Sequence, residues 1–268
     1  MAQTSQSASR PAVALGAVWF AATLAVLAYG FHLALFVAPT EATMGNVQRI
    51  FYWHVPSAML ALVFPYVNFA ASVAFLVLRR SNLYAALTAD AIAVASAEVT
   101  VVFTSIGLVT GMLWGKAVWG IWWTWDARLT TFLLLWLLYV AYLMTRRLSV
   151  TGQTSTVGAV LSVFAAVDVP IVYMSIRWWR TQHPSPVFGG GADSGLDKSM
   201  YPAFLWNIAG WAMWGLFILV TRFYLERRRQ RAHEEATLRA LDASLDPHHG
   251  GTPNLPQQFR NREQNNAF

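Results

Sequence analysis

The stretch Trp114–Thr130, WGKAVWGIWWTWDARLT, is the most distinctive part of the chain and lies between two long apolar segments. Up to Arg128 it contains five of the thirteen tryptophans. Tryptophan is common at membrane–water interfaces, where its ring lies at the headgroup level, so one or two of these residues need no other explanation. Five tryptophans in one connection instead predict an aromatic platform for a large flat ligand. The neighbouring Gly111, Gly115 and Gly120 would expose backbone beside it.

The segments that flank this stretch have the composition of a membrane protein. Of the 268 residues, 56% are hydrophobic and only 12% are charged, which is outside the range of ordinary soluble domains. A helix needs about 20 consecutive apolar residues to cross a bilayer. The sequence therefore predicts an all-α integral membrane protein with six transmembrane helices. The expected spans are residues 12–38, 57–78, 90–112, 129–145, 156–176 and 201–221.

Positive charge is distributed unequally between the two sides of this expected membrane domain. Thirteen of the nineteen Lys and Arg residues fall on the side that holds the termini, and six fall on the side of the tryptophan-rich connection. The positive-inside rule then predicts that both termini are cytoplasmic and that the tryptophan-rich connection faces outward. The net charge of +6 lies in the tail and at helix ends, so we interpret it as a topology signal and as contact with anionic lipid, not as nucleic-acid binding.

Three regions follow from composition. Residues 1–11 are expected to be a disordered cytoplasmic N-terminus, and residues 12–221 to form the six-helix membrane domain. Residues 222–268 are expected to be a basic cytoplasmic tail that is helical at first and disordered from about residue 246.

Two further connections are expected on the outer side. GNVQRIFYWHVP, residues 45–56, has the pattern of a short amphipathic helix lying on the membrane surface, with Pro39 and Pro56 at its ends. Residues 177–200, rich in Gly, Ser and Pro, predict an irregular loop that shapes itself around a ligand.

Each of these two connections contains a histidine next to aromatic residues. His54 follows Tyr52 and Trp53, and His183 lies shortly after a Trp-Trp pair. A single histidine at an interface is more often a hydrogen-bonded surface residue than a ligand. Two imidazoles on either side of a ring platform, however, would suit a haem iron, which accepts nitrogen ligands from both faces. The chain has no cysteine, which excludes a disulfide framework, a thiolate metal site and haem attached through its own Cys-x-x-Cys-His.

Charged residues near the platform have more than one interpretation. Arg128, Arg177 and Arg180 flank it, and an arginine fork would suit haem propionates, although arginines also extend from interfaces into water without a ligand. Asp126 would accept a hydrogen bond from an indole N–H, orient Arg128, or cap the helix that begins near Ala127, and capping is the simplest of these roles.

Three carboxylates lie in or near the expected spans. Carboxylates are costly in a bilayer and therefore point to function. Asp90 lies near the inner end of the third span, Glu98 is a candidate for docking a partner helix, and Asp168 is a candidate for pairing with backbone groups freed by Pro170.

Three segments carry a resemblance to a known family: IFYWHVPSA around His54, WGKAVWGIWWTWDARLT in the second outer connection, and RWWRTQHPS in the third. Over residues 12–221, in this order, the chain resembles the haem exporter protein C family, a subunit of bacterial cytochrome c maturation. The resemblance implies a multi-pass inner-membrane protein without enzymatic activity that holds haem b at the periplasmic surface. It implies that His54 and His183 bind the haem iron. The implied haem-contacting residues of the motif are Trp114, Trp119, Trp122, Trp123, Trp125 and Asp126.

The resemblance also implies partners. Haem is presented to a periplasmic haem chaperone, and the subunit works with an ABC ATPase, a second membrane subunit and a small single-helix subunit. The sequence has no Walker A motif, so ATP hydrolysis would come from such a partner. The basic tail beyond about residue 230 lies outside the resemblance.

Two other function classes stay open. A haem b-containing membrane anchor for quinone-linked electron transfer would normally hold its histidine ligands inside the helices, and here both candidates are expected in loops. A transporter with a path through the bundle would need broken helices or midplane charges, for which Glu98 is slight support.

Overall fold

The computed structural model describes residues 10–148, 154–187 and 195–245. The chain divides into two compact units, residues 1–226 and 227–268. The seven α-helices of the described part are α1 (Arg10–His32), α2 (Phe51–Leu78), α3 (Leu83–Trp119), α4 (Ala127–Leu148), α5 (Thr154–Ala166), α6 (Asp168–Trp178) and α7 (Tyr201–Leu245), which ends in the second unit. A π-helical turn (Leu33–Val37) extends α1, and short 3-10 turns, Asn46–Ile50 and Lys198–Met200, precede α2 and α7.

The predicted all-α membrane class is confirmed. Six helical segments of the described residues are long and apolar enough to cross a bilayer. The fifth segment, Thr156–Trp178, is not one helix as expected but consists of α5 and α6, with a break at Val167. Pro170 explains the break, because it has no N–H to donate to the carbonyl of Ala166 one turn earlier.

Two helix boundaries differ from the predicted ones near the candidate site. The expected surface helix ending at Pro56 is wrong, because α2 begins at Phe51 and continues through Pro56. A proline inside a helix removes one backbone hydrogen bond but need not end the helix, and α2 also continues through Pro65. The expected loop from residue 114 is also wrong, since α3 continues to Trp119 and ends at Gly120, whose φ of 76° is a left-handed C-cap.

At the N-terminus, α1 begins at Arg10, so residues 10 and 11 are helical and the expectation of disorder is wrong for these two. Residues 1–9 and 246–268, for which disorder was also expected, lie outside the described residues.

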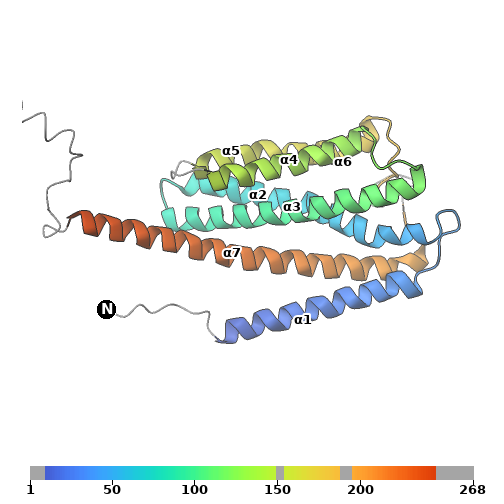
Figure 1. The fold of residues 1–268 in the computed structure, drawn as a ribbon, viewed down its shortest axis with the longest axis horizontal. Helices are drawn as coiled ribbons and strands as arrows, with labels where there is room; N and C mark the ends of the chain where they lie inside the picture. The colour runs from blue at the N-terminus through green and yellow to red at the C-terminus, as the bar shows by residue number, and fades with distance from the viewer. Residues whose placement is uncertain (1–9, 149–153, 188–194, 246–268) are drawn as a thin grey trace, which may run out of the picture. The chain divides into compact units, whose positions relative to one another are not determined.

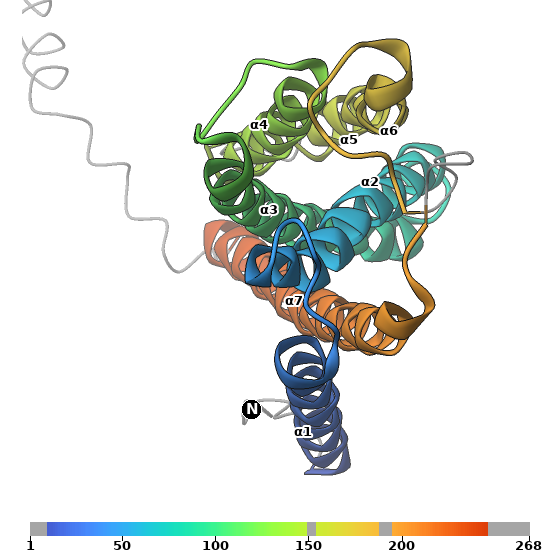
Figure 2. The same cartoon turned by 90° about the vertical axis from the view of Figure 1, so that its right-hand side faces the viewer.

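Helices α2 and α3 lie side by side in the middle of the first unit. Figures 1 and 2 show α4, α5 and α6 on one side of this pair and the part of α7 up to Glu226 on the other, with α1 beyond α7. The largest buried cluster joins α2, α3, α4, α5 and α6, with large side chains such as Phe64, Phe103 and Tyr139. Dispersion and burial of these side chains therefore hold α2, α3 and α4 in fixed positions relative to one another.

Polar groups inside this unit are mostly paired. Arg146 of α4 donates two hydrogen bonds of 2.7 Å to the carboxylate of Asp90 on α3. Arg222 of α7 pairs with Glu98 of α3, so the expected partner helix of Glu98 belongs to the same chain. Asp168 was expected to pair with backbone groups freed by Pro170. Its Oδ2, however, is buried and has no hydrogen-bond partner among the described residues.

Within the first unit, helix α1 packs against α7. Tyr29 and Trp206 meet edge to face with ring centroids 4.9 Å apart, and the amide of Asn207 donates to the carbonyl of Gly30 at 2.8 Å. At Gly210 the two helices approach so closely that an added Cβ would lie 2.7 Å from Cδ2 of Leu27 and 3.3 Å from its Cα. The absence of a side chain at Gly210 therefore sets the distance between α1 and α7.

Substitution of Gly210 by alanine tests this contact. We expect Gly210→Ala to destabilise the purified protein by about 1–3 kcal/mol, the usual cost of overpacking, because the Cα of Leu27 is backbone and cannot rotate away. Gly16→Ala on α1 is the matched control, since no atom lies within 4 Å of an added Cβ there. Thermal unfolding in detergent measures both variants, and equal melting temperatures would contradict the prediction.

Candidate functional site

The two histidines predicted as a pair lie together in the structure. His54 is in the first turn of α2, and His183 lies in the connection after α6. Their ring centroids are 6.3 Å apart and their planes are inclined by 41°. Two imidazoles bound on opposite sides of one metal ion have centroids roughly 6 Å apart, because each metal–nitrogen bond is about 2 Å long. The pair therefore has the spacing of two axial ligands.

The ring of His183 is held in the protonation state that a ligand needs. Its Nδ1 lies 2.8 Å from the carbonyl oxygen of Pro184. A carbonyl only accepts, so Nδ1 carries the proton and the lone pair of Nε2 is free. Burial, together with the positive charge of Arg128, lowers the pKa of His183 to about 4, so the imidazole is neutral at physiological pH.

The pair supplies two nitrogen ligands. Among the described residues, no group of three or more His, Cys, Asp or Glu side chains gathers in a way that would hold a metal ion. Haem would suit two protein ligands, because the four nitrogens of its porphyrin leave only the two axial positions to the protein.

The tryptophans are divided between a helix end and a short connection. Trp114 and Trp119 lie on the last turns of α3 with ring centroids 5.1 Å apart, and the predicted single loop is corrected in this respect. Trp123 and Trp125 lie in the connection before α4, edge to face at 5.6 Å. Nζ of Lys116 lies 5.9 Å from the ring of the exposed Trp122. The side chains thus form two aromatic pairs and a fifth ring at these helix ends, and Trp122 and Trp125 are exposed.

One of these indoles has an unused polar group. Nε1 of Trp123 is buried and has no hydrogen-bond partner among the described residues. A buried donor without a partner is costly. It would be satisfied by an acceptor that enters with a ligand.

Asp126 caps helix α4. Its Oδ1 accepts a hydrogen bond of 2.9 Å from the backbone N–H of Leu129, and its Oδ2 accepts one of 3.2 Å from the hydroxyl of Thr124. The capping role expected from the sequence is confirmed. Because the cap lies directly after Trp125, it also fixes where the tryptophan-rich connection ends.

Of the three arginines expected at the site, Arg128 is the one that acts on the histidine pair. Its charge influences the rings of both His54 and His183, and its guanidinium also donates to the carbonyl of Val172 on α6. Arg177 lies over the ring of Tyr173, 5.0 Å from the centroid. Arg180 is exposed to solvent. Arg177 and Arg180 thus lie on the outer surface rather than against the imidazoles.

Two neighbours of His54 were not connected with it by the sequence. Thr110 of α3 has its hydroxyl 3.0 Å from Nδ1 of His54, and a Cβ on Gly111 would lie 3.1 Å from Cε1 of the same ring. Gly111 was expected to expose backbone in a loop and instead lies within α3. No pattern in the sequence indicates these contacts, since a threonine or a glycine in an apolar helix is ordinary.

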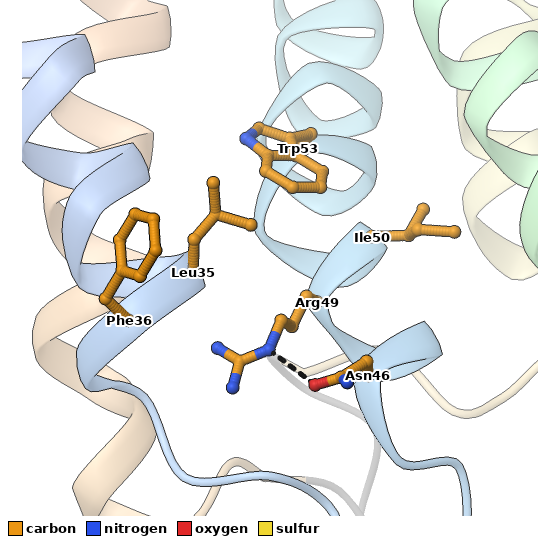
Figure 3. Close-up of a pocket in the computed structure, with 6 residues that line it drawn as sticks. All are labelled: Leu35, Phe36, Asn46, Arg49, Ile50 and Trp53. Atoms are coloured by element: carbon orange, nitrogen blue, oxygen red, sulfur yellow. Dashed lines mark hydrogen bonds between the residues drawn. The ribbon is translucent and has the colours of Figure 1, made fainter.

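A pocket of about 410 Å³ lies beside the site, between the end of α1 and the start of α2 (Figure 3). Arg49 is held on one wall, where its Nε donates to Oδ1 of Asn46 at 3.1 Å and its guanidinium donates to the carbonyl of Ala34. The sequence did not single out this pocket, whose lining residues come from the π-helical turn after α1, the 3-10 turn before α2 and the first turn of α2. They are Leu35, Phe36, Asn46, Arg49, Ile50 and Trp53.

Comparison with known proteins gives a consistent result. A family model described as heme exporter protein C matches residues 2–238. A heme exporter protein C of Bradyrhizobium diazoefficiens is 35% identical over 216 residues, which cover 79% of this chain and 79% of that protein. A heme exporter protein C of Escherichia coli strain K12 is 32% identical over 225 residues, covering 79% of this chain and 85% of that protein.

Proposed function

The chain belongs to the haem exporter protein C family, and from this premise we propose that it binds haem between His54 and His183 and delivers it for the biogenesis of c-type cytochromes. The observation that supports this best is the 6.3 Å separation of the two imidazole centroids. Among the described residues neither ring belongs to a cluster of three or more His, Cys, Asp or Glu side chains. The ring of His54 lies against Gly111 on α3, the helix that ends at Trp119. A flat cofactor with two free axial positions is the ligand that this arrangement fits.

The surrounding residues have separate tasks in this proposal. Trp114, Trp119, Trp122, Trp123 and Trp125 provide the aromatic surface that excludes water from the ring of haem b. Arg128 binds a propionate, with Arg177 and Arg180 available at the surface for the second carboxylate. Asp126 fixes the tryptophan-rich connection by capping α4. The binding energy must stay limited, because haem has to leave.

We propose the bacterial inner membrane as the location, with both termini in the cytoplasm and the histidine pair at the periplasmic surface. The acceptor is a periplasmic haem chaperone. An ABC ATPase, a second membrane subunit and a small single-helix subunit complete the complex, and the basic tail contacts anionic lipid. The chain has no catalytic role of its own in this scheme and no affinity for nucleic acid.

The proposal is tested by purifying the full-length chain alone from a haem-sufficient host. We expect about one haem per chain and an absorption spectrum typical of iron with two imidazole ligands. Adding the apo form of the haem chaperone should then deplete haem from the chain and load the chaperone. A chain that carries no haem, and does not take it up when haem is added, would overturn the proposal.

Asp126 allows delivery to be separated from folding. We expect Asp126→Ala to lower the yield of loaded chaperone strongly while reducing stability by only about 1 kcal/mol, the usual cost of losing an N-cap. Asp126→Asn is the matched control, because asparagine also caps helices and keeps the shape of the connection. Thermal unfolding and the yield of loaded chaperone are measured for both variants. A normal yield with Asp126→Ala would count against a role of this connection in delivery.

A further inference from the structure

We propose that Thr110 is a positioning residue for haem binding: it holds His54 in the tautomer that has its proton on Nδ1, so that Nε2 is free to bind iron. This inference rests on the proposed function for its purpose. The tautomer of His54 itself can be tested in the protein without haem.

The hydroxyl of Thr110 has one proton, which it donates to a carbonyl of its own helix. Oγ1 lies 2.6 Å from the carbonyl oxygen of Ile106, one turn earlier in α3, and 3.3 Å from that of Gly107. Carbonyl oxygens accept and never donate, so the threonine proton points toward α3. The lone pairs of Oγ1 then face His54, whose Nδ1 is 3.0 Å away. Two acceptors cannot share a hydrogen bond, and Nδ1 must therefore carry the proton.

A second acceptor on α3 also interacts with the His54 ring. It is the carbonyl of Gly107. Like any carbonyl, it stabilises a protonated ring nitrogen and repels a lone pair. A neutral imidazole has one N–H, so a proton held on the α3 side leaves the other nitrogen with a free lone pair.

Gly111 brings the ring close enough for this hydrogen bond. An added Cβ at Gly111 would lie 3.1 Å from Cε1 of His54, which is tighter than ordinary van der Waals contact, and 3.7 Å from its Nδ1. Glycine therefore lets the imidazole lie directly against α3. Thr110 and Gly111 together fix both the position and the orientation of the ring.

Both histidines then have the same tautomer, with the proton on Nδ1. His183 donates its Nδ1 proton to Pro184, and His54 donates its Nδ1 proton to Thr110. In both rings Nε2 is left unprotonated. A ligand histidine commonly donates its second ring N–H to a fixed acceptor, and loss of that acceptor typically weakens metal affinity by about 10- to 100-fold.

The test compares three variants of the full-length chain. Thr110→Val has nearly the same shape but lacks the acceptor, Thr110→Ser restores it, and Thr104→Val is the matched control. Thr104 is also buried on α3, and its hydroxyl bonds only to the helix carbonyls of Thr100 and Val101 in the described structure. The first measurement is nitrogen-15 NMR of histidine-labelled protein without haem, which reports the tautomer of His54 directly. The second is the affinity for added haem.

We expect the Nδ1-protonated form of His54 in the unmodified chain, in Thr110→Ser and in Thr104→Val. In Thr110→Val the Nε2-protonated form should become populated and haem affinity should fall about 10-fold, the lower end of the usual range because Gly107 still offers an acceptor. An unchanged tautomer and affinity in Thr110→Val, in a protein that binds haem normally, would overturn the role of Thr110 and leave the proposed function intact. Absence of haem from every variant, with the expected tautomers, would instead overturn the proposed function.

Discussion

Replacing either His54 or His183 by alanine should remove most of the haem absorption of the purified protein while the variant still inserts into the membrane in normal amounts. In the proposed site, each substitution leaves the iron with one imidazole from this pair. Loss of a residue that merely supports a metal ligand costs about 10-fold in affinity or more, so loss of the ligand itself should cost well above 10-fold. Any haem that remains should show the spectrum of iron with a single imidazole. Absorption spectroscopy of haem-loaded protein, normalised to protein amount, measures both effects.

His32→Ala is the control for this experiment. His32 is exposed at the end of α1, where its ring lies 5.5 Å from that of Phe36. Its removal should leave the spectrum and the amount of bound haem unchanged. Normal spectra in both His54→Ala and His183→Ala would exclude the pair as the haem ligands, whatever the outcome for delivery.

The sequence predicted the membrane class and the meeting of the two histidines for clear physical reasons. Apolar segments of sufficient length have no alternative to helices in a bilayer, because each backbone polar group must be satisfied within its own segment. Connections that leave the membrane on the same side of a compact bundle lie near one another. His54 and His183 were therefore expected together although 129 positions separate them in the sequence.

The errors occurred where tertiary contacts outweigh local signals. Pro56 looked like the end of a helix, yet α2 passes through it, as it does through Pro65, and each proline removes one backbone hydrogen bond. Trp114 and Trp119 looked like loop residues, yet α3 continues under them until Gly120 provides a left-handed cap. The role of Thr110 depends on the side-chain geometry of two helices, and no spacing within the chain encodes it.

The sequence also did not predict which charged side chains pair with each other. The sequence identified Arg146 as a topology signal and Asp90 as a costly carboxylate, but it gave no reason to connect them. In the structure the two side chains form a bidentate pair with hydrogen bonds of 2.7 Å. Arg146 thus has two roles, since it marks the cytoplasmic side in the proposed topology and neutralises a buried charge on α3.

Breaking this pair should have a large effect on stability. The side chains of Arg146 and Asp90 are only 13% and 5% exposed, so Arg146→Met removes the guanidinium that binds this buried carboxylate through two hydrogen bonds. We expect Arg146→Met to destabilise the protein by about 3–5 kcal/mol. The double variant Asp90→Asn with Arg146→Met removes both charges and should recover most of that loss, because a buried pair contributes little net stability compared with neutral side chains of similar size. Arg147 remains in both variants and preserves the positive charge at this helix end.

An exposed ion pair of the same chain is the matched control. Arg239 and Glu235 of α7 lie 3.3 Å apart with side chains 65% and 66% exposed. Arg239→Met should therefore change stability by less than about 1 kcal/mol, as is usual for surface pairs. Thermal and denaturant unfolding in detergent, followed by tryptophan fluorescence, gives the three values. If Arg146→Met were as mild as Arg239→Met, the Asp90 carboxylate would have to reach water or another cation. If the double variant were as unstable as Arg146→Met, the cost would come from lost packing of the arginine side chain rather than from loss of the charge opposite Asp90.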